Sequence, residues 1–370
     1  MIRWRSMCAV ILPLAGSMRL APSACCLSCN ACFPAGKITV LDTGVAMPNT
    51  NSIRVFFLIT ALFLSSGCLA NLPETREPPG GTCRISTSLS YRASQRTFLL
   101  HVPVKYRSGI PLPLVVVLHG AFSTGTQTET ETGFSKLADS KGFLVAYPEG
   151  IGLFGLLQHW NAGHCCGKAA KDQVDDVGFV AEVIATVRRK LAVDPARVYL
   201  AGMSNGGMLT HRFAAERGAD LAAAAVVSGA IGSVVAQGDA PWKLPQPEGA
   251  VPMIVFHGLA DDSVPASGGV SPGKKDERSY LAVSDAIDFW RNADGCGVTP
   301  EVQLSNNGLV KRQTWDNCRN GSAVESVLLS GWGHQWPAPW FTDRLGTDDP
   351  LRNFDATQQM WSFFSRFHLR

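Results

Sequence analysis

The pentapeptide Gly202-Met203-Ser204-Asn205-Gly206 restricts the fold of this 370-residue chain more than any other feature. It directly follows the apolar run Val198-Tyr199-Leu200-Ala201 and precedes a stretch with helical character at 208–216. A strand that turns into a helix within this pattern forces the serine into a sharp bend, and glycines are needed there because side chains would collide with neighbouring backbone. The bend exposes the Ser204 hydroxyl above the carboxyl edge of a sheet. The pattern therefore predicts a nucleophilic serine.

Apolar runs of β-type residues alternate with helical patterns after this chain's first quarter. The predicted strands are 96–101, 114–118, 143–147, 198–201, 223–228, 253–257 and 324–329, and the clearest predicted helices are 176–191, 279–292 and 355–367. The strands are apolar without alternation, which is typical of strands buried on both faces. The sequence therefore predicts the α/β class, with a mostly parallel central sheet and helices on both faces.

An export signal is predicted well downstream of Met1. Residues 53–64 are apolar apart from Arg54 and Thr60, and small residues follow up to Cys68. The apolar run is shorter than the roughly 20 residues that span a membrane. We assign 1–46 to a misassigned upstream segment, 47–70 to a signal peptide, 71–93 to a tether and 94–370 to the catalytic domain. Lipidation of Cys68 and plain cleavage near Ala70 are both open, so we expect an extracellular or periplasmic protein with or without a lipid anchor.

The net charge limits the classes of binding partner, and the cysteines suggest which disulfides form. The net charge of +3 is small and scattered, which argues against nucleic acid or an anionic membrane surface as a partner. An exported chain can keep disulfides, and Cys296 with Cys318 is the predicted pair. Cys165 and Cys166 either bond to each other, or one of them bonds to Cys83.

A serine nucleophile needs an adjacent base, which is in turn oriented by an acid. His334 follows the last predicted strand in the glycine-containing loop Gly331-Trp332-Gly333, and it comes late enough for the order nucleophile, acid, histidine. Asp261 and Asp262 follow the strand at 253–257 by a short loop. Spacing alone leaves both carboxylates open as the acid.

The oxyanion hole of such a site combines two backbone amides. One belongs to the residue after the nucleophile, here Asn205, and the other comes from the loop after an early strand. That loop is His119-Gly120-Ala121-Phe122. Ala121 is the predicted donor, Phe122 is the alternative, and we expect His119 to be structural.

The segment 159–166 contains two histidines and two adjacent cysteines. Adjacent cysteines are poorly placed to occupy two corners of a tetrahedral metal site, and no second ligand cluster follows, so we predict no metal here. We interpret the segment as a rigid wall beside the substrate and assign Trp160 to substrate binding. Trp336 is assigned to the facing wall, with a core or surface position as the alternative.

Six motifs occur together in one order. They are a strand followed by His119-Gly120, Trp160-Asn161-Ala162-Gly163 with Cys165-Cys166-Gly167, Val174-Asp175-Asp176-Val177, the elbow at 202–208, His257-Gly258-x-x-Asp261-x-x-Val264-Pro265, and Gly333-His334-x-Trp336-Pro337. From about Ser94 onward the chain resembles the poly(3-hydroxybutyrate) depolymerase and feruloyl esterase family of secreted α/β-hydrolases. The resemblance implies the α/β-hydrolase fold, a Ser204-Asp261-His334 triad, hydrolysis of carboxylic esters and no cofactor. Ala121-Phe122 departs from the small or Cys-containing segment often found there.

The predicted function is hydrolysis of 3-hydroxybutyrate oligomers by a serine esterase that forms an acyl-enzyme. A feruloyl or acetylxylan-type esterase acting on plant polysaccharide esters is the first alternative. A serine peptidase of the prolyl-oligopeptidase type and a non-catalytic surface binding protein are the others. The binding protein would be expected to lack a triad position, and this sequence retains all three.

Overall fold

The computed structural model describes residues 80–153, 155–234, 242–272, 278–339 and 345–369. The predicted upstream segment, the signal peptide with Cys68, and the first part of the predicted tether lie outside these residues. Within the described ranges, no helix is both long enough and apolar enough to cross a membrane.

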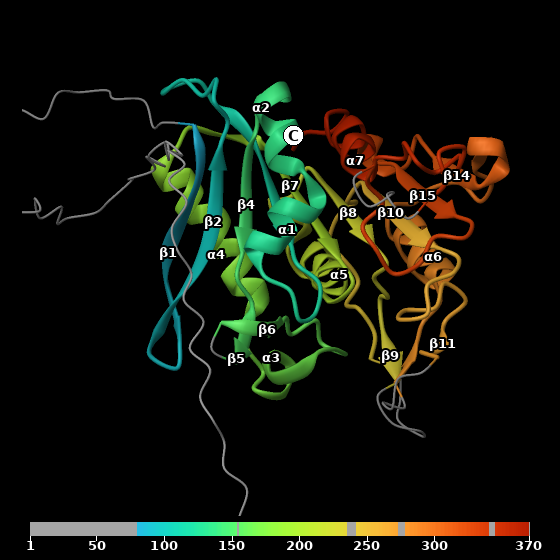
Figure 1. Ribbon diagram of the computed structural model, residues 1–370, viewed down its shortest axis with the longest axis horizontal. Coiled ribbons are helices and arrows are strands. Elements are labelled where there is room, and N and C mark those ends of the chain that lie inside the picture. Colours follow the sequence, from blue (N-terminus) through green and yellow to red (C-terminus); the bar gives the residue numbers. More distant parts are fainter. Residues whose placement is uncertain (1–79, 154, 235–241, 273–277, 340–344, 370) are drawn as a thin grey trace, which may run out of the picture.

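A ten-stranded sheet forms the centre of the molecule (Figure 1), with the strand order β1-β2-β4-β3-β7-β8-β10-β15-β14-β13. The strands are β1 Gly81–Tyr91, β2 Ser94–Val102, β3 Leu112–Leu118, β4 Leu144–Pro148, β7 Val193–Met203, β8 Ala223–Val227, β10 Met253–Gly258, β13 Glu301–Ser305, β14 Val310–Trp315 and β15 Val324–Leu329. The six strands from β4 to β15 are parallel, and the remaining edge strands are antiparallel. All seven predicted strands are present.

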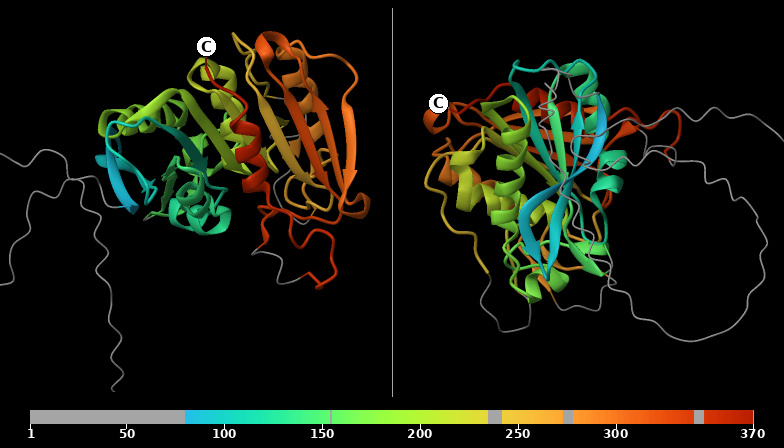
Figure 2. Two further views of the ribbon diagram at one scale, coloured as in Figure 1. Left: turned by 90° about the horizontal axis from the view of Figure 1, so that it is seen from above. Right: turned by 90° about the vertical axis from the view of Figure 1, so that its left-hand side faces the viewer.

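Helices cover both faces of this sheet (Figure 2), as predicted. One face is packed by α4 Asp176–Lys190, α5 Asn205–Arg217 and α6 Val283–Ala293, and the other by α2 Phe134–Lys141 and α7 Ala356–Phe364. Each face has its own apolar cluster, because the buried parallel strands present apolar side chains to both sides. The helix predicted at 279–292 begins at Val283 instead. Ser279–Tyr280 forms a short strand, β12, that pairs with β9.

Short elements complete the described chain. They are α1 Gly125–Thr132, α3 Gly167–Lys171, β5 Ile151–Leu153, β6 Leu156–His159, β9 Ser233–Val234, β11 Gly269–Val270 and β12 Ser279–Tyr280. The hairpin of β5 and β6 and the small sheet of β11, β12 and β9 lie outside the main sheet. Three single 3-10 turns occur at Gly218–Asp220, Asn306–Gly308 and Arg319–Gly321.

Strand β1 is the main difference from the predicted organisation. Residues 71–93 were assigned to a tether, but Gly81–Tyr91 pairs antiparallel with β2. Arg92 and Ala93 join the two strands with φ angles of 49° and 63°. Turns with two positive φ angles usually contain Asn or Gly, so this hairpin has no typical turn signal. The tether assignment is therefore wrong over these residues, and the folded domain includes Gly81–Tyr91.

Two disulfides are present among the described residues. Cys296 and Cys318 are bonded with an S–S distance of 2.02 Å, which confirms the predicted pair. Cys165 and Cys166 are bonded to each other, so the adjacent pairing is correct and the alternative pairing with Cys83 is wrong. The Cys83 sulfur instead lies 3.8 Å from the Leu100 carbonyl oxygen.

Candidate active site

Ser204 occupies a strained turn between β7 and α5, with φ 52° and ψ −123°. Strand β7 lies between β3 and β8, in the middle of the sheet. A β-carbon on Gly202 would collide with the Gly206 backbone, and one on Gly206 would collide with the carbonyl oxygens of Leu118 and His119. The close approach of backbone at both positions agrees with the predicted turn. It places Ser204 at the carboxyl end of the central parallel strands.

Three predicted residues meet at this end of the sheet. His334 Nε2 lies 2.9 Å from Ser204 Oγ, and His334 Nδ1 lies 2.8 Å from Asp261 Oδ2. Asp261 follows β10, and His334 lies in the loop after β15, which pairs in parallel with β10. Parallel pairing therefore brings the acid and the histidine together, because both loops leave the same edge of the sheet.

The Asp261 carboxylate is buried and fully engaged. Its Oδ1 accepts hydrogen bonds from the amides of Ser263 at 2.9 Å and Val264 at 2.8 Å. Burial acts to raise the pKa of Asp261, but the hydrogen bond and attraction of His334, with the amides, hold that pKa below its usual value. An ionised carboxylate on Nδ1 leaves the Nε2 lone pair facing the serine hydroxyl. Asp262 instead accepts from the Ser263 hydroxyl at 3.4 Å, so the geometry pairs the histidine with Asp261.

His257 is a second histidine beside Asp261 that the sequence analysis did not assign a role. Its Nε2 donates to the Val264 carbonyl oxygen at 2.8 Å and lies 3.6 Å from Asp261 Oδ2. Burial lowers the pKa of His257, which favours the neutral ring. His257 therefore closes the loop that presents Asp261. His257 lies four positions before Asp261, and this spacing was the only sequence pattern that could have predicted their contact.

The two predicted oxyanion donors lie on adjoining segments. A β-carbon built on Gly120 would lie 3.5 Å from Ser204 Cβ, so the loop after β3 passes directly beside the nucleophile. The Phe122 amide donates to the Gln158 carbonyl oxygen at 2.8 Å. Because that donor is engaged, the geometry favours Ala121 over Phe122. Asn205 stands at the start of α5, where backbone amides favour negative charge.

His119 supports this loop in its neutral form. Its Nδ1 donates to the Gly120 carbonyl oxygen at 2.7 Å, and its Nε2 accepts from the Gly150 amide at 3.0 Å. Burial lowers its pKa to about 4. Both ring nitrogens are occupied, which agrees with the expected structural role.

Comparisons with known proteins show which family the chain resembles. The sequence profile described as "Esterase PHB depolymerase" matches residues 100–240. Feruloyl esterase B of Piromyces equi is 28% identical over 239 residues, covering 63% of this chain and 42% of that protein. Poly(3-hydroxyalkanoate) depolymerase C of Paucimonas lemoignei is 24% identical over 270 residues, covering 64% of this chain and 58% of that protein. The chain is similar to the PHB depolymerase family of esterases, as its sequence motifs predict.

The fold agrees with this assignment. Acetyl xylan esterase from Aspergillus awamori superimposes with a TM-score of 0.53 at 16% identity, covering 77% of this chain and 99% of that one. The chain thus has the predicted α/β-hydrolase fold. Its sequence relatives are named esterases or depolymerases, which supports a carboxylic ester hydrolase. It spans less than two thirds of the length of the two sequence relatives. These relatives favour an esterase over the peptidase and binding-protein alternatives.

The two tryptophans assigned to substrate binding are core residues of the esterase. Trp160 has no exposed surface, and its Nε1 donates to the His119 carbonyl oxygen at 2.9 Å. Trp336 is 2% exposed, and its Nε1 donates to Thr357 Oγ1 at 2.9 Å. Both rings are buried in the core, so the assignment of these two residues to substrate binding is wrong, and the core position given as the alternative for Trp336 is correct.

Both the Trp160 backbone and the disulfide lie against Asn205, the residue that follows the nucleophile. Asn205 holds the Trp160 backbone with both side-chain atoms, accepting from its amide at 2.7 Å and donating to its carbonyl at 3.0 Å. The same Asn205 amide group lies 4.0 Å from Cys165 Sγ. Segment 159–166 therefore contacts Asn205 through the Trp160 backbone and through Cys165. Because their sulfurs are bonded to each other, they are not thiolates available to a metal.

A buried ion pair holds this wall from behind. Asp176 Oδ2 accepts from the Asn161 amide at 2.7 Å, and Arg96 Nη1 lies 2.6 Å from Asp176 Oδ1. Both charged side chains are nearly inaccessible to solvent. The Val174-Asp175-Asp176-Val177 motif of the family is thus a support for the loop that carries the disulfide.

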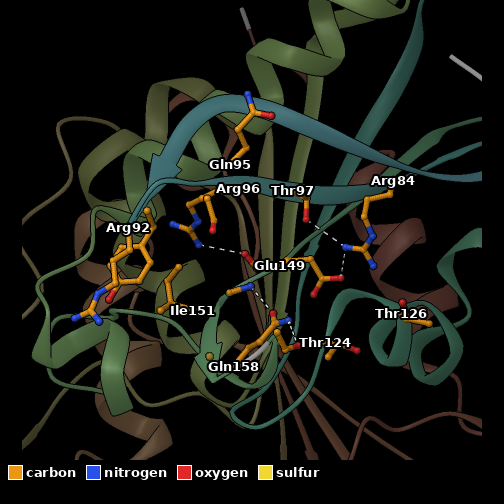
Figure 3. Close-up of a pocket in the computed structure, with 15 residues that line it drawn as sticks. Arg84, Arg92, Gln95, Arg96, Thr97, Thr124, Thr126, Glu149, Ile151 and Gln158 are labelled. Atoms are coloured by element: carbon orange, nitrogen blue, oxygen red, sulfur yellow. Dashed lines mark hydrogen bonds and ion pairs between the residues drawn. The ribbon is translucent and has the colours of Figure 1, made fainter. Parts of the chain in front are cut away.

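A separate cavity of about 560 Å³ lies between the β1–β2 hairpin and the β5–β6 hairpin (Figure 3). Arg84 and Glu149 form an ion pair in it at 2.9 Å, and Gln158 lies on its wall. None of the three triad residues lines this cavity. Gly150 and Gln158 line this cavity and also hydrogen-bond to His119 and Phe122 of the predicted oxyanion loop. The cavity therefore lies behind that loop.

Proposed function

We propose that the esterase hydrolyses 3-hydroxybutyrate oligomers through an acyl-enzyme on Ser204, with His334 as the base and Asp261 as the acid. The observation that carries the proposal is the continuous hydrogen-bonded line from Asp261 through His334 to Ser204 at a strained elbow. The match to the PHB depolymerase profile and to a poly(3-hydroxyalkanoate) depolymerase supports the choice of ester.

The first half of the reaction forms the acyl-enzyme. His334 Nε2 takes the hydroxyl proton as Ser204 Oγ attacks the ester carbonyl carbon. Asp261 stabilises the imidazolium that results. The amides of Ala121 and Asn205 donate to the oxyanion of the tetrahedral intermediate. The intermediate collapses when the C–O bond to the alcohol breaks, and the imidazolium returns its proton to the departing alkoxide.

The second half releases the acid. His334 takes a proton from water, and the resulting hydroxide attacks the acyl carbon. Collapse of the second tetrahedral intermediate breaks the bond to Ser204 Oγ, which recovers the proton. Every step uses side chains and backbone amides of this chain.

The test is product analysis after the protein is offered 3-hydroxybutyrate oligomers and methyl ferulate together, with Ser204→Ala as the blank. We expect free 3-hydroxybutyrate, and a fall in rate of about 10⁴-fold or more in the Ser204→Ala variant. The thermal unfolding midpoint of that variant should match the parent protein. Near-parental turnover by Ser204→Ala would overturn the triad, even if the products are as expected.

A feruloyl or acetylxylan-type esterase is the second candidate. It is favoured by the 28% identity to Feruloyl esterase B over 63% of this chain. In the same experiment, free ferulate without 3-hydroxybutyrate would select this candidate. The triad and both half-reactions would be unchanged, and only the ester would differ.

Export, through the segment assigned to 47–70, remains a prediction. Intact mass of the protein recovered from a bacterial host distinguishes the two forms. A mass increase equal to a diacylglyceryl group on a chain beginning at Cys68 indicates a lipid anchor. A chain that begins near Asn71 without added mass indicates plain cleavage.

A further inference from the structure

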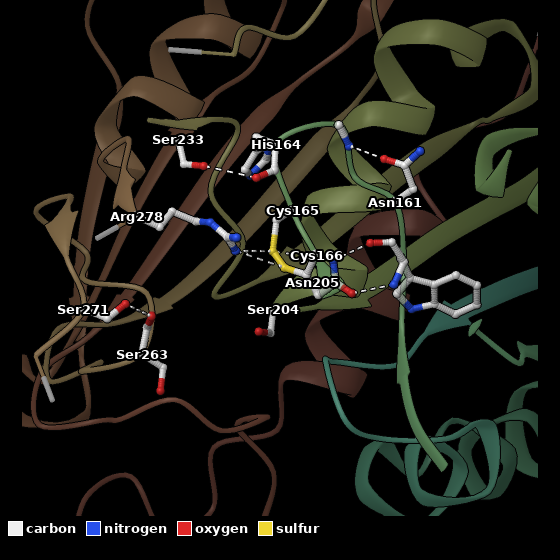
Figure 4. The surroundings of a disulfide bond; sticks show 12 residues. Asn161, His164, Cys165, Cys166, Ser204, Asn205, Ser233, Ser263, Ser271 and Arg278 are labelled. Atoms are coloured by element: carbon white, nitrogen blue, oxygen red, sulfur yellow. Dashed lines mark hydrogen bonds between the residues drawn. A yellow bond between two sulfur atoms is a disulfide. The ribbon is translucent and has the colours of Figure 1, made fainter. Parts of the chain in front are cut away.

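Arg278 lies on the far side of the disulfide from the residue that follows the nucleophile. Its Nη1 is 3.0 Å from Cys165 Sγ and 3.5 Å from Cys166 Sγ (Figure 4). Cys165 Sγ is in turn 4.0 Å from the side chain of Asn205, which adjoins Ser204. The guanidinium is thus separated from the nucleophile by only the disulfide and one residue.

The charge of Arg278 lacks the partner that a shielded guanidinium normally has. The side chain is half-buried, and its Nε is closed off from solvent without a hydrogen-bond partner in the described part of the chain. No carboxylate of the described residues forms an ion pair with it. Disulfide sulfur is a weak acceptor, whereas a planar guanidinium matches a carboxylate with two parallel hydrogen bonds.

Two described groups near Arg278, His164 and Asp261, do not supply that partner. His164 is buried in the same loop as the disulfide. Its pKa is lowered to about 3, mainly by burial and secondly by the charge of Arg278. It is therefore neutral at ordinary pH and carries no competing positive charge. The Asp261 carboxylate is occupied by His334 and two amides. Within the described residues, Arg278 therefore places a positive charge without a carboxylate partner beside the disulfide.

We propose that Arg278 binds a free carboxylate of the substrate, so that the esterase prefers esters with an anionic end over neutral esters of the same shape. The inference rests on the proposed function and deepens it. A 3-hydroxybutyrate oligomer ends in a carboxylate on the alcohol side of its last ester bond. A feruloyl ester of a neutral sugar has no such group. Arg278 is a specificity-determining residue that favours the first class of substrate.

The test compares two matched substrates. One is the 3-hydroxybutyrate dimer as the free acid, and the other is the same dimer with its terminal carboxylate converted to a primary amide. We expect kcat/KM to favour the acid by about 10- to 100-fold, the range of a hydrogen bond to a charged group. The preference should fall as salt is added, because the interaction is between two charges.

Variants assign that preference to one side chain. Arg278→Gln should reduce the acid-to-amide ratio to about one while changing kcat/KM for the amide by less than about threefold. Arg278→Lys should restore part of the ratio, since it keeps the charge without the planar fork. Arg217→Gln, on an exposed ion pair with Asp220 far from the disulfide in sequence, is the matched control and should keep the full ratio.

The outcomes separate this inference from the proposed function. If the parent protein cleaves acid and amide equally, or Arg278→Gln keeps the preference, the inference is overturned while Ser204-dependent cleavage leaves the proposed function standing. If neither dimer is cleaved above the Ser204→Ala blank, both proposals are overturned. Thermal unfolding of each Arg278 variant shows whether a lost preference comes with lost folding, and Arg278→Lys decides the matter if Arg278→Gln does not fold.

Discussion

Two buried carboxylates, Asp176 and Asp261, hold two sides of the same site by different means. Asp176 begins α4 and faces the guanidinium of Arg96 at 2.6 Å. Asp261 follows β10 and faces the imidazole of His334 at 2.8 Å. Both carboxylates also accept backbone amides of a loop, Asp176 from Asn161 and Asp261 from Ser263 and Val264.

The partner decides what each carboxylate does. Arg96 is charged throughout, so its pair with Asp176 is equally strong before, during and after a reaction. Burial raises the pKa of Asp176 and lowers that of Arg96, and their mutual attraction opposes both shifts. In the proposed reaction, His334 takes the proton of Ser204 and becomes positively charged, so the attraction of Asp261 for it is greatest in the transition state. Burial of a carboxylate alone therefore does not distinguish support from catalysis, but the partner does.

Replacing Asp261 by Asn should have the largest effect on turnover. Asparagine can donate to Nδ1, which favours the wrong tautomer and leaves the developing imidazolium without its countercharge. We expect kcat to fall by about 10⁴-fold with little change in the unfolding midpoint. Steady-state kinetics and thermal unfolding measure the two quantities. Asp262→Asn is the matched control and should change kcat by no more than about twofold; equal losses in both variants would contradict the assignment of the acid.

Replacing Asp176 by Asn should show the opposite pattern. The variant leaves Arg96 buried and unpaired, which costs about 3–5 kcal/mol of unfolding free energy. The kcat of the folded protein should change far less than in Asp261→Asn. Urea unfolding and active-site titration give stability and the rate per folded molecule.

Asp175 provides the matched control for Asp176. It caps α4 by accepting from the Gly178 amide at 2.7 Å, outside the buried ion pair. Asparagine is an equally good cap, so Asp175→Asn should change the unfolding free energy by less than about 0.5 kcal/mol. A large loss there, or a small one in Asp176→Asn, would show that the ion pair does not hold this region.

The catalytic side of this comparison was the part that sequence predicted best. Ser204, Asp261 and His334 each lie within a short motif directly after a predicted strand, and parallel strands bring such loops to one edge. The supporting side was not predicted. Arg96, the partner of Asp176, lies on a strand 80 positions earlier in the chain, and no sequence motif near either residue predicts that contact.

The errors in the sequence analysis have similar causes. Trp160 was placed beside the substrate because it shares a segment with the disulfide, but its ring packs against His119 in the loop after β3, with centroids 4.5 Å apart. Strand β13 was missed because all five of its residues are exposed, which leaves no buried face to produce a pattern. Strand β1 was missed because only Ile85 and Thr87 along it are buried. Local sequence patterns predict helices and strands that have a buried face. They do not predict which residues are buried by contacts with distant parts of the chain.

Asp294 is a third buried carboxylate. Among the described residues, neither an arginine nor a histidine forms an ion pair with it. It accepts from the Val251 amide at 3.0 Å and from the Ser322 hydroxyl. Burial raises its pKa to about 6, against about 3.9 in an unfolded chain. The folded state therefore binds this proton more tightly than the unfolded state, so the unfolding free energy should fall as pH rises from about 4 to about 6.

The size of that fall is at most about 3 kcal/mol, because two pKa units correspond to about 2.7 kcal/mol. Asp261 has a lowered pKa, so its contribution has the opposite sign and is lost only as pH falls below about 4. Urea unfolding of the parent protein and of Asp294→Asn at pH 4, 5, 6 and 7 isolates the Asp294 term as their difference. That difference should change steadily between pH 4 and 6 and then level off. A difference independent of pH would mean that the folded protein and the unfolded chain bind this proton equally, and that the two hydrogen bonds to Asp294 fully offset the effect of its burial.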